Sequence, residues 1–302
     1  MMGWRTIMIS QHAKVSLTTG NLVIQTDSDR LHVPVDQVNV LLIQTLQAVI
    51  TTAAVAALSE EHVKIIFTGR DGQPICETAE CYPHLRTAAL VTSQVNWPHD
   101  RVANLWTRVV AAKMANQIAV ADLLGAETRS LRDEVDKLEL DDATNREAVV
   151  ARQYFPLLFG EDFSRSDLVP ENAALNYGYS ILLSLVDRVI VSRGYLTCFG
   201  IHHKNAGNGF NLGSDLMEPF RPIIDYWVAQ QKINDLTPDV KFGLVRLFDL
   251  EMTYQGKKEL FSNVVEKYVG QCLKYLNAEI DQIRIEVEVP DEVSNYAIND
   301  YV

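Results

Sequence analysis

The hydrophobic pattern changes its period near Pro83, and this change constrains the fold more than any other feature of the sequence. From Trp4 to about Phe67, short runs rich in β-branched residues recur roughly every eight to ten residues and are separated by turn residues. After Pro83, apolar residues recur at three- and four-residue steps over longer segments, which is typical of helices that bury one face. The sequence therefore predicts an α+β fold, with a β-sandwich-like N-terminal domain followed by a larger all-helical domain.

Turn residues and charge suggest where the domains begin and end. An Ala-rich stretch from Leu46 to Leu58 interrupts the strands with a helical pattern, and Gly72 and Pro74 mark the exit from the β-rich part. Apolar alternation from Ile283 to Val289 predicts one added strand before a flexible acidic end. We expect a β-rich domain over 1–75, a linker over 76–84, a helical domain over 85–277 and an acidic C-terminal extension over 278–302.

Composition limits the cellular context. The 302 residues include 47% hydrophobic residues, enough for a substantial core. No apolar run approaches the roughly 20 residues that a membrane-spanning helix needs, and the N-terminus has no signal-peptide pattern. We therefore expect a cytoplasmic protein that does not associate with a membrane.

The net charge of −12 argues against a nucleic-acid partner unless the negative charge is local. Residues 127–142 carry seven acids and three bases, and residues 279–302 carry seven acids and one base. These segments contribute −4 and −6, so only −2 remains for the rest of the chain. A near-neutral body can carry local basic patches, and a partner protein can supply more positive surface.

The stretch from Cys198 to Pro222 contains the strongest local signal for chemistry. A Gly- and Asn-rich loop separates His203 from Asp215 and Glu218, so the imidazole can return close to two carboxylates. Such a set suits a metal ion, and a helix start beside it also favours an anionic ligand such as phosphate. The structural alternative is that Asp215 caps a helix with Glu218 as its reciprocal partner, and that His203 is an ordinary loop residue.

A second signal lies at Glu147. Thr144 begins the sequence T-N-R-E, a capping-box pattern in which Glu147 would return a hydrogen bond to the Thr144 amide. Arg146 and Arg152 flank this acid near a helix start, where guanidinium groups pair with phosphate or with neighbouring carboxylates. The local pattern alone thus leaves a structural and a functional interpretation open.

Three segments together resemble the CRISPR-associated integrase family, which inserts new spacers into CRISPR arrays, and most closely its type II-A branch. The likeness runs from Gly3 to about residue 277, and its most specific parts are NREAVVARQYF, NAALNYGYSILLS and HKNAGNGFNLGSDLMEPFRP. In this family a glutamate, a histidine and a final acid hold a divalent ion. The helical domain would therefore be the catalytic domain.

The resemblance assigns the three metal ligands and catalytic residues to Glu147, His203 and Glu218, with Asp215 as a supporting acid. His202 competes with His203 and is less favoured only by spacing. Two departures from the family pattern are Ala148, where a glycine is usual, and the loop KNAGNGFN after the histidine. Two carboxylates and one imidazole suit Mg²⁺ or Mn²⁺ better than a closed structural zinc site.

Further residues are candidates for supporting the site or contacting DNA. Asn176 and Tyr177 resemble positions that face the family's active site, although an aromatic residue at helical spacing is more often part of a core. The other candidates are the cationic residues near the two motifs, Arg146, Arg152, Lys204 and Arg221.

The resemblance implies a DNA integrase that joins the 3′-hydroxyl ends of prespacer DNA to the CRISPR repeat by transesterification. It also implies a homodimer formed largely through the β-rich domain, with a small companion adaptation protein in a heterohexamer. Double-stranded prespacer and leader-repeat DNA, the type II-A effector nuclease and an accessory protein are the other expected partners. Two alternatives remain: a metal-dependent nuclease of branched DNA, and a catalytically silent DNA-binding scaffold.

Overall fold

The computed structural model describes residues 5–69, 74–78 and 87–293. The chain divides into two compact units, Met1–Pro83 and His84–Val302. Within the predicted linker, residues 79–84 lie outside the described residues, as do residues 294–302 of the predicted extension.

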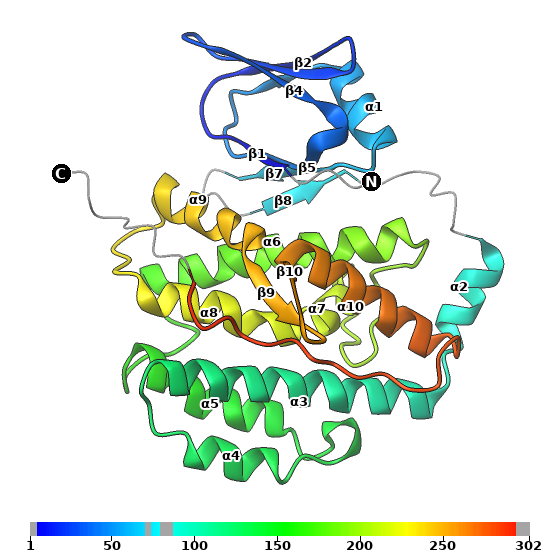
Figure 1. Cartoon of the computed structure of the whole chain (residues 1–302), viewed down its shortest axis with the longest axis vertical. Coiled ribbons are helices and arrows are strands. Elements are labelled where there is room, and N and C mark those ends of the chain that lie inside the picture. Colours follow the sequence, from blue (N-terminus) through cyan, green and yellow to red (C-terminus); the bar gives the residue numbers. More distant parts are fainter. Residues whose placement is uncertain (1–4, 70–73, 79–86, 294–302) are drawn as a thin grey trace. The chain divides into compact units, whose positions relative to one another are not determined.

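The first unit contains the strands that alternation predicted, and they form two sheets (Figure 1). One sheet has the strand order β1-β5-β7-β8 and the other β4-β3-β2-β6. Its elements are β1 (Arg5–Ile9), β2 (Lys14–Thr18), β3 (Asn21–Gln25), β4 (Arg30–Pro34), β5 (Val38–Ile43), β6 (Val49–Ile50), α1 (Thr52–Glu60), β7 (Lys64–Thr68) and β8 (Pro74–Glu77).

Both sheets contribute to a single apolar core, but the pairing is not that of a simple sandwich of hairpins. The pairs β1–β5, β5–β7 and β2–β6 are parallel, and α1 packs against β2 and β7, one strand from each sheet. Ala54 and Leu58 of α1 are fully buried in this core. The strand-rich prediction and the helical stretch within it are confirmed, whereas the parallel pairs depart from a simple sandwich.

Two predicted boundaries in this unit need correction. The helix expected at 46–58 begins at Thr52, because the Thr51 side chain caps it by accepting a hydrogen bond from the Ala54 amide. Strand β8 pairs with β7 and extends to Glu77, so the β-rich part continues beyond the expected boundary at residue 75.

The second unit is mainly helical (Figure 1). Its elements are α2 (Ala88–Val95), α3 (His99–Leu123), α4 (Arg129–Val135), α5 (Arg146–Phe159), α6 (Pro170–Ser192), α7 (Asn211–Leu216), the 3₁₀ turn η3 (Glu218–Phe220), α8 (Arg221–Gln230), α9 (Pro238–Arg246), β9 (Glu251–Tyr254), β10 (Lys257–Leu260) and α10 (Phe261–Leu276).

Helix α6 is the central helix of this unit. It packs against α7, α8, α9 and α10, and Pro170 in its first turn and Gly194 just beyond its end are residues that start and stop helices. By length and composition α6 could cross a membrane, but 78% of its most apolar window is buried. It is therefore a core helix of this unit.

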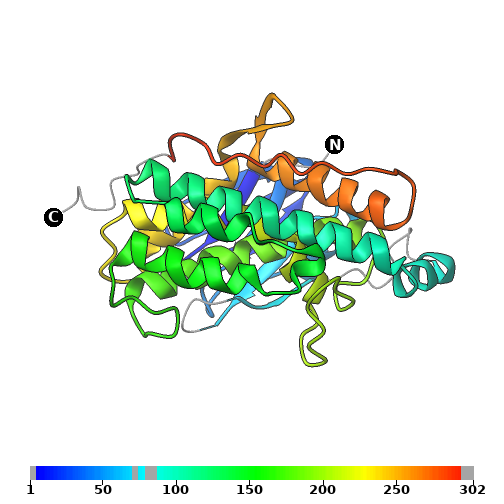
Figure 2. The same ribbon diagram turned by 90° about the horizontal axis from the view of Figure 1, so that it is seen from below.

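Helix α3 is the second organising element. It runs beside α5, as Figures 1 and 2 both show, and it also contacts η3, α7 and α8. The three- and four-residue recurrence of apolar residues expected after Pro83 is confirmed here, since Leu105, Trp106 and Val109 are fully buried. Helix α3 thus contacts α5, η3 and α7, the elements that carry Glu147, Glu218 and Asp215.

The unit is not all-helical as expected. Strands β9 and β10 form an antiparallel hairpin within it. The strand predicted at 283–289 is reduced to one isolated bridge between Val287 and Tyr254 of this hairpin.

Candidate active site

At the start of α5, Glu147 does not have the capping role that the sequence suggested. Asn145, in a left-handed conformation with φ of 53°, caps the helix by accepting from the Ala148 amide at 3.4 Å. The Asp142 carboxylate accepts from the Arg146 and Glu147 amides at 2.7 and 3.1 Å. The capping-box interpretation is therefore wrong, and the Glu147 carboxylate is available for other contacts.

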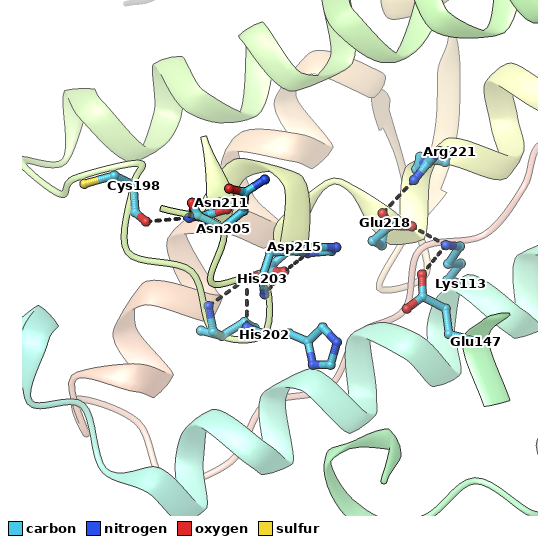
Figure 3. A network of polar contacts seen from close by, with 11 residues as sticks. Lys113, Glu147, Cys198, His202, His203, Asn205, Asn211, Asp215, Glu218 and Arg221 are labelled. Atoms are coloured by element: carbon cyan, nitrogen blue, oxygen red, sulfur yellow. Dashed lines mark hydrogen bonds and ion pairs between the residues drawn. The ribbon is translucent and has the colours of Figure 1, made fainter. Parts of the chain in front are cut away.

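Lys113 of α3 lies between the two predicted carboxylate ligands (Figure 3). Its Nζ forms ion pairs with Oε1 of Glu147 and Oε2 of Glu218. Lys113 and Glu218 are almost completely buried, at 6% and 2% exposure. Two carboxylates from distant segments thus converge on one cationic atom.

The turn η3 and the start of α8 hold Glu218 in place. Arg221 donates from Nη1 to Oε1 of Glu218 at 2.8 Å, and its guanidinium lies 4.1 Å from the centre of the Tyr179 ring. Burial alone would raise the pKa of Glu218, but Arg221 and Lys113 outweigh it and lower the pKa to about 2. Glu218 therefore carries a negative charge at neutral pH.

Asp215 organises the loop that carries the two histidines. This fully buried carboxylate accepts from the amides of Ile201, His202 and His203 at 2.7, 2.9 and 3.1 Å, and it also bonds Nδ1 of His203. It lies in the last turn of α7 and points back toward the loop rather than capping α8. The expected cap with Glu218 as partner is therefore wrong, whereas the expected approach of His203 to Asp215 is confirmed.

Gly200 allows the loop to approach Asp215 so closely, and it precedes the Gly- and Asn-rich loop that the sequence indicated. A Cβ on Gly200 would lie 2.5 Å from the His203 carbonyl oxygen and 2.7 Å from Oδ2 of Asp215. Gly207 and Gly209 lie in the more open part of the loop and adopt no positive φ. The close approach at Gly200, rather than flexibility at the later glycines, lets the loop close onto Asp215.

The two histidines have different environments. The His202 ring stacks on Trp106 with centroids 4.2 Å apart and an interplanar angle of 8°. The hydrogen bond that Nδ1 of His203 donates to Asp215 raises the pKa of His203, with smaller contributions in the same direction from Glu218 and Glu147. Because a carboxylate only accepts, Asp215 fixes the proton on Nδ1 and leaves Nε2 of His203 as the nitrogen for a ligand.

The donor types fit a hard divalent ion. Glu147 and Glu218 already share one cation, and both acids add to the rise in the pKa of His203. Within the described residues, however, no three His, Cys, Asp or Glu side chains form a ready-made metal cluster. Lys113 stands between the two carboxylates, so an ion could join them only if this ammonium moved.

Three of the cationic candidates for contacting DNA, Arg146, Arg152 and Lys204, lie on α5 and in the histidine loop. Arg146 pairs with Glu134 at 2.8 Å, while the exposed Arg152 bonds the Ala148 carbonyl of its own helix. Lys204 is exposed in the histidine loop.

On α6 the two candidates differ. Asn176 is exposed and accepts from Arg165 at 2.8 Å. Tyr177 is fully buried, with Lys241 5.8 Å from its ring centre, so it is a core residue, as an aromatic at helical spacing more often is.

Sequence reasoning missed Lys113. A signal for it exists, because Lys113 follows the buried Trp106 by seven residues and Val109 by four, on the core-facing stripe of α3. A lysine on such a stripe requires a buried anionic partner.

Comparison with known proteins extends these observations. The sequence profile of the family described as CRISPR associated protein Cas1 matches residues 7–264. The CRISPR-associated endonuclease Cas1 of Neisseria meningitidis serogroup C (strain 8013) is 31% identical over 276 residues, covering 89% of this chain and 91% of the relative.

Two solved structures share the fold. A casposase bound to integration product aligns with a TM-score of 0.77 at 20% identity, covering 93% of this chain and 92% of that one. A Cas6-RT-Cas1–Cas2 complex aligns with a TM-score of 0.70 at 17% identity, covering 97% of this chain and 36% of that one. The profile match and the Neisseria relative together establish that this chain belongs to the Cas1 family of CRISPR-associated proteins.

Proposed function

We propose that this protein is a divalent-metal-dependent DNA integrase of CRISPR adaptation, which joins 3′-hydroxyl ends of prespacer DNA to the CRISPR repeat. The observation that carries the proposal is the convergence of Glu147 and Glu218 on one cationic atom, together with the hydrogen bond by which Asp215 orients His203. The Cas1 family membership and the fold shared with a casposase bound to integration product support it.

The reaction is a transesterification that conserves the number of phosphodiester bonds. The prespacer 3′-oxygen forms a new bond to a phosphorus at the edge of the repeat, the original P–O bond breaks, and the released oxygen becomes a new 3′-hydroxyl. Glu147, Glu218 and Nε2 of His203 would hold Mg²⁺ or Mn²⁺, which would lower the pKa of the attacking hydroxyl and stabilise the charge on phosphorus.

The remaining residues prepare this site. Asp215 selects the tautomer of His203 and orients its ring. Arg221 keeps Glu218 charged and fixes the direction of its carboxylate. Arg152 and Lys204 are exposed cations that suit contacts with DNA phosphate.

The proposal includes assembly and context. We assign the protein to the type II-A branch, with a cytoplasmic location, a homodimer formed largely through the strand-rich unit and a heterohexamer with Cas2. The Cas6-RT-Cas1–Cas2 complex, which shares the fold, supports Cas2 as a partner. Prespacer and leader-repeat DNA, the effector nuclease and an accessory protein complete the expected set.

The test mixes the protein and Cas2 with labelled duplex that has free 3′ ends and a plasmid that carries the leader and repeat, with Mn²⁺ or with EDTA. We expect label joined to the plasmid only with Mn²⁺, and no joining by a folded Glu147→Gln variant. Cleavage of branched DNA without joining would instead identify a nuclease. Binding without either product would identify a scaffold.

A further inference from the structure

Lys113 occupies the position at which the two glutamates meet, and neither of its contacts is a surface ion pair. Its side chain is 8% exposed, and the side chains of Glu147 and Glu218 are 19% and 3% exposed. Figure 3 shows the ammonium group between the two carboxylates, which come from separate segments of the chain. Lys113 therefore connects α3, α5 and η3 through one nitrogen atom.

The two oxygens of Glu218 have different partners. Arg221 holds Oε1, whereas Lys113 holds Oε2, the oxygen on the path to Glu147. An ion that joins Glu147 and Glu218 would need this second oxygen. Arg221 can stay in place when such an ion binds, but Lys113 cannot.

The positive charge of Lys113 offsets the repulsion between the carboxylates of Glu147 and Glu218. Two mainly buried carboxylates that face each other repel, and a buried ammonium is retained only with charged partners. In the absence of a divalent ion, the Lys113 ammonium reduces the repulsion between the two carboxylates, and they in turn are the charged partners that it needs. Its four-carbon chain also lets the ammonium move without moving α3.

We propose that Lys113 is an internal counter-ion that holds Glu147 and Glu218 together and is displaced from them when a divalent ion binds. The inference rests on the proposed function, because it takes these carboxylates as metal ligands. Lys113 is thus a positioning residue that competes with the ion. If its ammonium occupies the carboxylates in more than about nine molecules in ten, the apparent affinity for the ion is reduced at least about tenfold.

The test compares Mn²⁺ binding by the wild type, Lys113→Met, Lys113→Gln and Lys113→Arg, measured through the electron paramagnetic resonance signal of free Mn²⁺. Glu147→Gln establishes that the measured ion is at this site. Lys64→Met is the matched control, since the Lys64 side chain is similarly buried, at 6% exposure, and pairs with a carboxylate, Glu77, at 2.6 Å in the other unit. Melting temperatures with and without Mn²⁺ are recorded for every variant.

We expect Lys113→Met and Lys113→Gln to bind Mn²⁺ at least about tenfold more tightly than the wild type, while Lys113→Arg and Lys64→Met do not. Without metal, the two neutral variants should melt at lower temperature, because their carboxylates are left facing each other. Mn²⁺ should raise their melting temperatures more than that of the wild type.

Three results would overturn the inference. Wild-type binding that depends on Glu147, with equal or weaker binding by both neutral variants, would refute the competition while leaving the proposed metal site intact. Binding that is absent from all variants, or unaffected by Glu147→Gln, would refute the metal site as well. Failure of both neutral variants to fold even with Mn²⁺ would show that the ammonium has a structural role that an ion does not replace.

Discussion

Nδ1 of His203 bonds the carboxylate of Asp215, a residue twelve positions along the chain that has no solvent exposure. The same carboxylate accepts hydrogen bonds from three consecutive backbone amides of the histidine loop, those of Ile201, His202 and His203. One buried side chain therefore sets both the path of the loop and the orientation of the imidazole.

Asp215→Asn should disturb both the path of the histidine loop and the orientation of the His203 imidazole. An asparagine has one acceptor oxygen where the carboxylate has two, so some amides and Nδ1 of His203 lose their partner. We expect a loss of about 3 kcal/mol in the free energy of unfolding, as hydrogen bonds to charged groups are worth about 1.5 to 3 kcal/mol each, together with loss of DNA joining. Urea unfolding and the joining assay measure the two effects, and a variant of wild-type stability would contradict the role of Asp215.

His203→Ala should abolish joining with little effect on stability, because its side chain is 45% exposed. His202→Ala should have the opposite effect. It removes the ring that stacks on Trp106 and should cost about 1 kcal/mol, the usual value of an aromatic pair, while joining continues. Loss of joining in His202→Ala with normal activity in His203→Ala would move the metal ligand by one residue.

Asp225 should make stability depend on pH. Burial raises its pKa from 3.8 to about 6, although the Tyr179 hydroxyl and Arg221 favour the charged form. Because the folded pKa lies above the unfolded one, the stabilising contribution of the protonated form is complete below about pH 4 and is lost as pH rises through about 6. Its size is about 3 kcal/mol, given 1.36 kcal/mol for each unit of pKa.

Asp225→Asn tests this dependence directly. The amide oxygen can still accept from the Tyr179 hydroxyl, so the variant should be at least as stable as the wild type at pH 8 and should lack the wild-type change between pH 4 and 6. Urea unfolding of both proteins across this range is the measurement. Identical pH profiles would show that Asp225 titrates normally.

DNA binding should depend on Cas2. Outside the segments 127–142 and 279–302 the chain carries a net charge of only −2, which offers little positive surface to a duplex. We expect the protein alone to bind duplex DNA weakly and with strong salt dependence, and Cas2 to raise the affinity. Titrations at two salt concentrations measure this, and equally tight binding without Cas2 would contradict the inference from charge.

The sequence predicted the elements of the fold better than their pairing. Alternation identified the strands because each buries one face, and the three- and four-residue period identified α3 and α6 for the same reason. The parallel pairing of β1 with β5 and of β5 with β7 was not predictable from local pattern, since it joins strands that are distant along the chain.

The site was predicted in part, and mainly through resemblance. The T-N-R-E pattern favoured a capping role for Glu147, but the Asn145 side chain, on a residue in a left-handed conformation, accepts from the Ala148 amide and takes the cap. The contact of Asp215 with three amides depends on loop closure over Gly200, which no local pattern encodes. Lys113 was detectable as a charge on an apolar stripe, but its two partners come from segments 34 and 105 residues away.

Anomalous diffraction from crystals of the protein soaked in Mn²⁺ shows directly which residues hold the ion. We expect one strong anomalous peak bound by Glu147, Glu218 and Nε2 of His203, with the Lys113 ammonium moved away from both carboxylates. Crystals in which Mn²⁺ binds elsewhere, while Lys113 still joins Glu147 and Glu218, would contradict this expectation.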